Sequence, residues 1–496
     1  MAQRFSNTLY EYLTENPKHI TLVIYALLAK KERPTKTLHI RAAFSPVQLN
    51  ALFKQYIEYE PASINQLRLI VISQNDLKIG LDDEVRLMAK RREAILSEEL
   101  LAQGIRNEHA LKVSFGPYND WKRCEDSDNE YSLIYDSRWI SENLDYPTLL
   151  DNFICWLEYA DMQCRSTLPM RKQHISALED MTIVKGQKTY NTGYSFKMVH
   201  FLQVIQMQAY YEQLKNHNIA LEEIFLWFFE EYLPMEFTVD RFAYNVPSAG
   251  SSYLEKCKLI AGEIEGVLKQ FKHYQARGHI DKELLEMSSE HLFFQQIPSL
   301  LSKKYVYAKS ERIKLCISYL FNDCMLGFFP DDAEYEDCDC LYDSIKKYKR
   351  LPMSLFTQKY HKHPLRCLLD FGVLIETDGY LTLDFTKSTI LYDLYNSSVL
   401  CYHHNSKIQN AIDELIASDD LCTESTLFSL PEQEYLDYIL NKATFSNGLD
   451  LRNKYVHGSK SKNDTENYSD YLEFLLIMVM IIIKMNDEFC LKYPLQ

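Results

Sequence analysis

Glycine is scarce in this sequence, with 14 residues in 496 against about 7% in an average protein. Neither the phosphate-loop pattern G-x-x-x-x-G-K-[ST] nor the dinucleotide pattern G-x-G-x-x-G occurs. The sequence therefore contains no motif that supports ATP-dependent or dinucleotide-dependent chemistry. The low glycine content instead favours a largely helical body.

The 12 cysteines include no C-x-x-C pair, so neither a zinc ribbon nor a dense disulfide scaffold is expected. The first residues contain no apolar segment of the kind that a signal peptide needs. The longest apolar run, Phe474 to Ile483, has ten residues. Since a membrane-spanning helix needs roughly 20, no membrane segment is expected. We predict a reduced, cytoplasmic protein.

What is abundant is apolar and acidic material: 46% of the residues are hydrophobic, and the formal net charge is −15. A chain of this length should divide into two to four domains. Because the overall charge repels nucleic acid, any contact with nucleic acid must use local basic patches. The sequence predicts a mainly α, multidomain protein.

Four regions can be distinguished. Residues 1–150 are predicted to be an α+β module, in which strand-like runs at 67–73, 110–115 and 131–137 accompany a charged helix at 82–103. Residues 151–330 form a helical middle region, and residues 331–389 a winged-helix-like segment. Residues 390–496 are predicted to form a helical bundle whose last helix, around 471–489, is apolar enough to be buried.

The charge reverses sign in the third region. Residues 331–343 carry seven carboxylates and no cation, which is more typical of a solvated loop than of a metal site. Residues 346–366 then carry only cations, namely Lys346, Lys347, Lys349, Arg350, Lys359, Lys362 and Arg366.

A helix followed by a hairpin is predicted just after these cations. The helix should end at Gly372, and two short strands should flank an Asp378-Gly379 turn. This order resembles a winged helix, so the seven cations are candidates for contact with DNA, RNA or a partner protein. Two alternatives stay open: the segment is only a packing unit, or its cations pair with the acidic run before it.

A second motif lies near the C-terminus, in residues 447–463. Arg452-Asn453 is followed by His457-Gly458, with apolar Leu451, Tyr455 and Val456 at helical spacings. The stretch resembles the R-N-x3-H signature of the HEPN superfamily of helical-bundle domains. The resemblance covers residues 390–496, with earlier bundle helices expected at 384–404, 407–418 and 431–443.

The resemblance implies a metal-independent endoribonuclease without a cofactor, in which a ribose 2′-OH attacks the adjacent phosphate. In that chemistry His457 would act as general base or acid, Arg452 would hold the phosphate, and Asn453 would orient the imidazole or the ribose. Lys454, Lys460 and Lys462 are candidates for RNA contact. The family type also implies a homodimer and a role as a regulated toxin or anti-phage effector.

Other interpretations stay open. Arg452 could pair with a nearby acid, the candidates being Asp450, Glu432, Glu434 and Asp437. Cys401, His403 and His404 have zinc-ligating side chains, but no fourth ligand stands at a motif spacing, so no metal site is predicted. A Cys–His or Ser–His–Asp hydrolase has no supporting motif. The alternative function is a non-catalytic nucleic-acid-binding regulator or scaffold that acts through the winged-helix-like segment.

Overall fold

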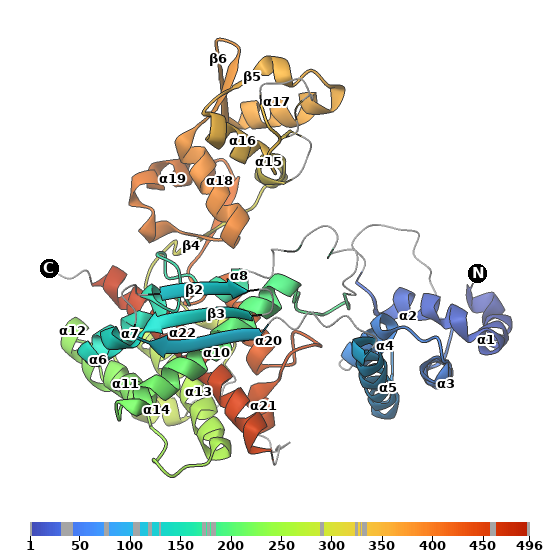
Figure 1. Ribbon diagram of the computed structural model, residues 1–496, viewed down its shortest axis with the longest axis horizontal. Coiled ribbons are helices and arrows are strands. Elements are labelled where there is room, and N and C mark those ends of the chain that lie inside the picture. Colours follow the sequence, from blue (N-terminus) through green and yellow to red (C-terminus); the bar gives the residue numbers. More distant parts are fainter. Residues whose placement is uncertain are drawn as a thin grey trace.

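In the computed structural model the chain is mainly helical, as predicted, and contains small three-stranded sheets (Figure 1). Among the described residues, no helix is both long enough and apolar enough to cross a membrane. The structure describes residues 2–30, 43–73, 79–102, 110–117, 122–127, 130–170, 175, 179, 185–287, 292–322, 326–327, 329, 335–456 and 463–493.

Buried apolar side chains form three large clusters. The N-terminal core runs from Leu13 to Ala89. The central core combines residues 133–297 with residues 427–489. The insertion core, from Val306 to Leu421, lies between these two stretches in the sequence. The predicted boundaries at residues 150, 330 and 389 do not coincide with the ends of these clusters, because distant segments of the chain share one core.

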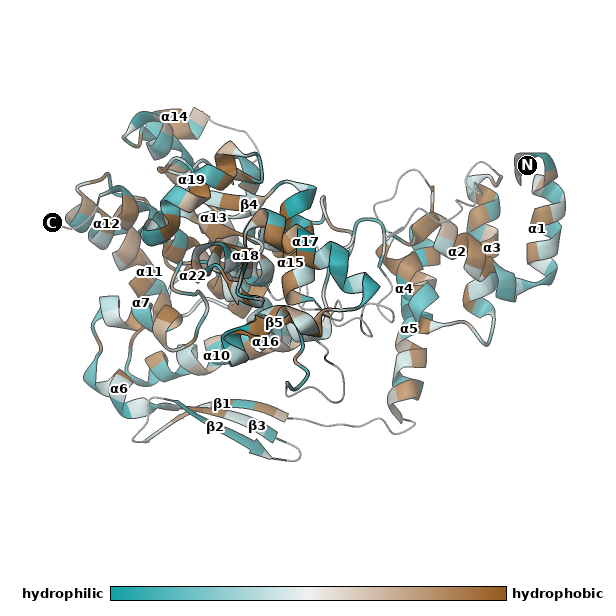
Figure 2. Cartoon of the chain, turned by 90° about the horizontal axis from the view of Figure 1, so that it is seen from above, coloured by the Kyte–Doolittle hydropathy of each residue, from teal (hydrophilic) through white to brown (hydrophobic). Residues whose placement is uncertain are grey.

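Among its described residues, the N-terminal core consists of helices and the turns between them, with no strand (Figure 2). The strand predicted at 67–73 is therefore wrong, because this segment belongs to helix α4. Gln66, Leu67, Leu69 and Ile70 are buried, a helical spacing that packs this face against α2 and α5. Tertiary packing outweighs the strand preference of the isoleucines and valine here. The helices are α1 (Ser6–Glu15), α2 (Ile20–Leu28), α3 (Pro46–Glu58), α4 (Ile64–Ile72) and α5 (Asp83–Ala102).

The predicted strands at 110–115 and 131–137 are present in one sheet with strand order β1-β3-β2. Strand β3 pairs parallel with β1 and antiparallel with β2. Leu133 and Tyr135 of β3 belong to the central core, so the sheet packs there and not on the N-terminal helices. The exposed edge strand β2 is charged, which disfavours pairing with another chain. The strands are β1 (Ala110–Gly116), β2 (Lys122–Ser127) and β3 (Glu130–Asp136).

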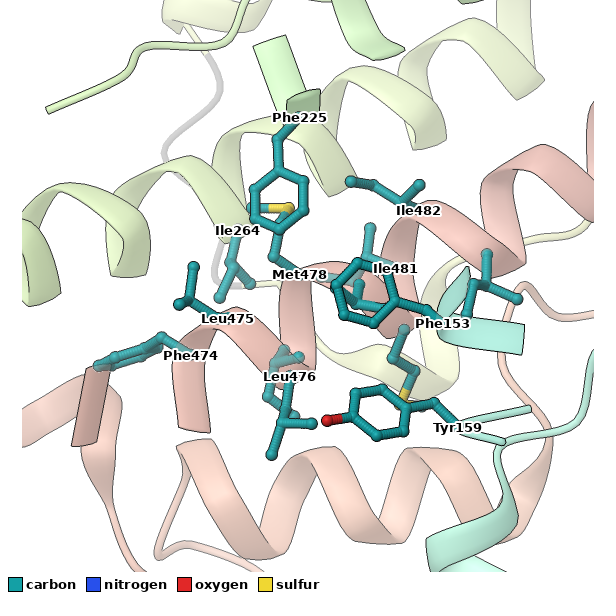
Figure 3. Close-up of a cluster of buried hydrophobic side chains, with 14 of the residues drawn as sticks. Phe153, Tyr159, Phe225, Ile264, Phe474, Leu475, Leu476, Met478, Ile481 and Ile482 are labelled. Atoms are coloured by element: carbon teal, nitrogen blue, oxygen red, sulfur yellow. The ribbon is translucent and has the colours of Figure 1, made fainter. Parts of the chain in front are cut away.

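Helix α22 (Asp464–Lys492) runs through the centre of the central core (Figure 3). Every residue from 471 to 485 is buried, so this part of the helix has no solvent face and needs neighbours on all sides. It packs against α10 and α13. The other helices of this part are α6 (Ser137–Glu142), α7 (Tyr146–Cys155), α8 (Thr167–Met170), α10 (Tyr194–Asn216), α11 (Leu221–Trp227), α12 (Leu233–Phe237), α13 (Tyr253–Arg277), α14 (Lys282–Met287), α20 (Leu430–Leu440) and α21 (Leu451–Val456).

A histidine–carboxylate pair joins α10 to α22. His200 Nε2 lies 2.8 Å from Glu473 Oε2, and both side chains are largely buried. Burial lowers the pKa of His200, but the charge and hydrogen bond of Glu473 outweigh it and raise that pKa above 6.5. The charged pair therefore contributes stability that is fully present below the unfolded histidine pKa and is lost as the pH rises through the folded value.

As the pH rises from about 6 to about 8, His200 loses its proton, and we expect the urea concentration at which half of the wild type is unfolded to decrease. The variant His200→Gln should have a flatter profile over this range, because the neutral amide has no proton to lose. Unfolding monitored by fluorescence at several pH values measures the difference. Identical profiles for the two proteins would contradict a charged pair.

The insertion is entered and left through adjacent strands, since β4 pairs antiparallel with β9. The predicted helix–hairpin unit is present inside it. Helix α17 ends at Gly372 with φ of 78°, and the β6–β7 turn places Asp378 and Gly379 at φ of 52° and 78°. Asp-Gly accommodates these two left-handed positions, which explains why this hairpin was predictable.

Two helices expected in the C-terminal bundle pack in the insertion core instead. Ile390, Leu391 and Leu394 of α18, with Ile412 and Leu415 of α19, are buried there, whereas α20, α21 and α22 belong to the central core. The insertion contains β4 (Tyr305–Ala308), α15 (Glu311–Phe321), α16 (Leu341–Tyr348), β5 (Leu351–Pro352), α17 (Lys362–Phe371), β6 (Leu374–Thr377), β7 (Tyr380–Leu383), α18 (Phe385–Ser397), β8 (Leu400–Cys401), α19 (Gln409–Ala417) and β9 (Leu421–Glu424).

Candidate functional site

Arg452 lies on the short helix α21, which is anchored by its own apolar residues. Leu451 and Tyr455 are buried in the central core on one face of the helix. Arg452 points toward α13, where its Nη2 and Nε atoms donate to Glu265 Oε2 at 2.7 and 3.1 Å. None of the four acids proposed from the sequence is its partner in these bonds. The guanidinium is thus already held by a carboxylate from a distant segment.

The carboxylate of Glu265 contacts two cationic side chains, Arg452 and Lys269. Its Oε1 lies 2.8 Å from Lys269 Nζ, one turn further along α13. Burial opposes ionisation of this carboxyl, but hydrogen bonds from Lys269 and Arg452 outweigh it and lower the pKa of Glu265. The carboxylate is therefore charged at neutral pH, and it competes with any anion for Arg452.

The Arg452–Glu265 pair lies at the edge of a narrow, mostly apolar pocket between α13, α20 and α22. The pocket is small, with a cavity volume of about 20 Å³, roughly enough for one water molecule. Since apolar walls reduce screening by water, an ion pair here is stronger than one on the open surface. The pocket is lined by Ala261, Ile264, Glu265, Leu268, Leu292, Phe294, Leu440, Asn441, Arg452 and Phe474.

Asn453 and Lys454 are also engaged by neighbouring acids. Asn453 Nδ2 donates to Asp450 Oδ1 at 2.7 Å, just before the helix. Lys454 Nζ lies 2.6 Å from Glu466 Oε1 and 2.5 Å from Asp470 Oδ2, so it ties α21 to α22. The two described cations of the motif, Arg452 and Lys454, are therefore both paired with carboxylates and do not form a free basic surface.

The rest of the motif falls outside the described residues. These are His457, Lys460 and Lys462. The described helix α21 ends at Val456, so His457 follows it directly in the sequence. The predicted roles of the three residues stay predictions.

All seven cations of residues 346–366 are exposed, and three of them contact neighbouring side chains. Lys347 pairs with Glu336 of the acidic run at 2.5 Å, which is the pairing that the alternative interpretation expected. Arg350 stacks over the Tyr380 ring at 4.3 Å, and Lys346 lies 5.6 Å from the Tyr342 ring centre. Lys349 is the residue after α16.

Three cations lie together at the start and along the exposed face of α17. Lys359 precedes the helix, and Lys362 and Arg366 are exposed on it. Arg366 Nε lies 3.6 Å from Asp370 Oδ2, a loose surface pair. This group is in the insertion, away from Arg452 on α21 in the central part (Figure 1). The two predicted sites are therefore not brought together.

A group of buried charges that the sequence analysis missed lies where the insertion meets α22. Lys304 pairs with Glu488, and Lys484 lies 3.1 Å from Glu432; all four residues are almost completely buried. Burial lowers the pKa of Lys484, but the charge of Glu432 outweighs it and raises that pKa. The available signal was Lys484 itself, a charge directly after the longest apolar run.

Comparisons with protein-family models, with curated proteins and with solved structures find no significant match to this chain.

Proposed function

We propose that the chain is a metal-independent endoribonuclease of HEPN type, working as a regulated toxin or anti-phage effector. The observation that carries the proposal is the position of Arg452. It lies at the edge of a pocket, five residues before His457, on a helix that packs beside the long buried helix α22. A guanidinium can hold a phosphate and an imidazole can transfer protons, which are the two tasks that RNA transesterification requires.

In the proposed reaction the ribose 2′-oxygen attacks the adjacent phosphorus, and the bond from phosphorus to the 5′-oxygen breaks. One proton leaves the 2′-OH and one is delivered to the 5′-oxygen, with His457 as the group that exchanges protons near neutral pH. Arg452 stabilises the additional negative charge on the phosphate. The products are a 2′,3′-cyclic phosphate and a free 5′-OH.

The contacts of Arg452 support a restrained resting state. Because Glu265 accepts two hydrogen bonds from the guanidinium, a phosphate must displace it before Arg452 can act. A partner subunit, RNA or a trigger that shifts α13 relative to α21 would release the arginine. We include a homodimer in the proposal, since HEPN-type nucleases commonly complete their sites across a dimer.

The proposal is tested by incubating the purified full-length protein with total RNA and with tRNA in EDTA. Cleavage products carrying 2′,3′-cyclic phosphate and 5′-OH ends support it. Intact RNA, together with no toxicity when the protein is overproduced in cells, contradicts it. Light scattering after size-exclusion chromatography measures the oligomeric state in the same preparation.

A second candidate function, nucleic-acid binding by a non-catalytic regulator, is favoured by the insertion. Helix α16, strand β5, helix α17 and the β6–β7 hairpin follow one another as in a winged helix, with strand order β5-β7-β6. Lys362 and Arg366 are exposed on α17, the helix that would enter a groove. This function would explain intact RNA in the assay above if duplex DNA is bound.

The double variant Lys362→Ala, Arg366→Ala is expected to weaken duplex DNA binding and to lower the slope of log affinity against log salt by about two. The reason is that each lost phosphate contact removes about 0.9 from the slope. Fluorescence anisotropy at several salt concentrations measures both effects. The matched control is Lys314→Ala, Lys407→Ala, which removes two exposed cations of the insertion outside α17. An equal loss in both double variants would contradict a specific role for α17.

A further inference from the structure

Three side chains with metal-ligating atoms meet where the insertion joins the central core. Cys164 comes from the loop before α8, His404 from the turn after β8, and Asp487 from the C-terminal part of α22. One ligand atom of each residue lies within 4.8 Å of the others. His404 Nε2 lies 2.7 Å from Asp487 Oδ1. Segments more than 80 residues apart in the sequence thus converge on one point.

One carboxylate oxygen at this point has no hydrogen bond. Asp487 is only 5% exposed, and within the described part of the chain no donor bonds its Oδ2 atom. Lys304 Nζ lies 3.9 Å from this Oδ2 atom, beyond hydrogen-bond distance, and His404 bonds the other oxygen, Oδ1. Buried polar atoms are normally satisfied, so this oxygen can take one further partner, either a cation or an ordered water.

The local charges point to a cation. Lys304 lies closest to Glu488 and Lys484 closest to Glu432, so two buried lysines are shared among three buried carboxylates, of which Asp487 is the third. A divalent cation bound by a thiolate and this carboxylate would form a neutral unit. Such a unit fits a buried position better than an unmatched carboxylate does.

The donor set and its spacing suit zinc. Sulfur, imidazole nitrogen and carboxylate oxygen bind Zn²⁺ at about 2.3, 2.0 and 2.1 Å, so tetrahedral neighbours lie about 3.3 to 3.7 Å apart. To admit the ion, the 2.7 Å separation of His404 and Asp487 must widen by about 0.6 Å. Two ligand atoms that lie as much as 4.8 Å apart must approach each other by about an ångström, which a side-chain rotation can provide.

We propose that Cys164, His404 and Asp487 bind one Zn²⁺ ion, with water in the fourth position, and that this ion fastens the insertion to α22. The thiol proton leaves to solvent when the metal binds. The site lies apart from Arg452 and takes no part in the proposed RNA cleavage. Its role is to hold two parts of the fold together.

The test uses the full-length protein loaded with Co²⁺ in place of zinc. We expect one cobalt ion per chain, a thiolate-to-cobalt absorption band in the near ultraviolet, and the visible bands of four-coordinate cobalt; zinc should displace all of them. Cys164→Ser should lose the thiolate band. His404→Gln and Asp487→Asn should bind cobalt more than about tenfold more weakly, since loss of even an outer-shell partner costs about 10- to 100-fold.

Two matched controls lie close by. His403 is the neighbouring histidine, but its Nε2 lies 2.8 Å from the Ser302 carbonyl oxygen, and Cys422 lies on β9. His403→Gln and Cys422→Ser should therefore keep both the cobalt spectrum and the affinity. Zinc should raise the melting temperature of the wild type and of both controls, and leave that of Cys164→Ser unchanged.

The wild-type spectrum decides the matter even if a variant fails to fold. Absence of stoichiometric cobalt, or bound cobalt without a thiolate band, would overturn the proposal. A thiolate band that persists in folded Cys164→Ser would overturn it as well. None of these measurements depends on RNA cleavage, so this proposal and the proposed function can fail separately.

Discussion

Replacing Arg452 by alanine is expected to lower the rate of RNA cleavage by about 100- to 1,000-fold, the usual cost of removing one donor that stabilises transition-state charge. His457→Ala should lower it by about 100- to 10,000-fold, because general acid–base catalysis contributes that much. Rates are measured with an end-labelled RNA in EDTA under single-turnover conditions. Arg277→Ala and His279→Ala, which remove exposed side chains near the end of α13, are the matched controls and should leave the rate unchanged.

Loss of activity on removing Arg452 has a structural explanation that must be separated from the chemical one. Arg452 also bonds Glu265, so the alanine variant leaves this carboxylate with Lys269 alone. The variant Glu265→Gln distinguishes the two explanations. If the arginine acts on phosphate and Glu265 restrains it, the glutamine variant should cleave RNA faster than the wild type. If the pair is only a packing contact, Glu265→Gln should cleave no faster and should melt at a lower temperature.

If Arg452→Ala and His457→Ala both cleave RNA at the rate of the wild type, the endoribonuclease proposal is wrong. The cleavage observed would then come from a contaminating nuclease or another site. The winged-helix-like segment would then be the better guide to function. Duplex DNA binding that depends on Lys362 and Arg366 would support this second candidate.

The features predicted well from the sequence are those in which local chemistry decides the backbone. Gly372 and the Asp378-Gly379 turn take left-handed positions that few other residues tolerate, so the helix end and the hairpin were readable without tertiary information. The long apolar run before Lys484 likewise had to be buried. In each of these places residue type and backbone geometry are directly linked.

Features that depend on distant partners were not predictable. Leu67 and Ile70 favour a strand locally, but contacts with α2 and α5 make the segment a helix. The alternative interpretation of Arg452 pairs it with an acid of its own region, yet its partner Glu265 lies 187 residues earlier. Helices α18 and α19 were grouped with α22 because they precede it in the sequence, although their apolar faces pack in the insertion core. Amphipathic patterns show which face is buried but do not identify the partner.

Disrupting the buried pair Lys484–Glu432 should have a large effect on the stability of the fold. Lys484 Nζ lies 3.1 Å from Glu432 Oε1 and donates to the Cys164 carbonyl oxygen at 2.9 Å. Glu432 also accepts one hydrogen bond from the Ser429 amide at the start of α20 and one from the Ser166 amide just before α8. Removing the lysine leaves a hydrogen-bonded but uncompensated charge inside the core.

We expect Lys484→Met to lower the free energy of unfolding by about 3–5 kcal/mol, as when one partner of a buried ion pair is deleted. The double variant Lys484→Met, Glu432→Gln should recover part of this loss, because the amide carries no charge and its oxygen can still accept from the Ser429 amide, although its NH2 group cannot accept from the Ser166 amide. Urea unfolding measures both values. Lys303→Met, which removes a solvent-exposed lysine paired with Asp413, is the control and should change stability little.

The double variant is decisive, because a cavity alone would also destabilise Lys484→Met. Methionine nearly fills the space of the lysine stem, so the cavity contribution is small, and any recovery on neutralising Glu432 must come from charge. If the double variant is less stable than Lys484→Met, the loss is due to packing, and Glu432 contributes through its hydrogen bonds to α20. Recovery would show that the core around α22 depends on matched charges, which is the condition under which a cation at Asp487 is favourable.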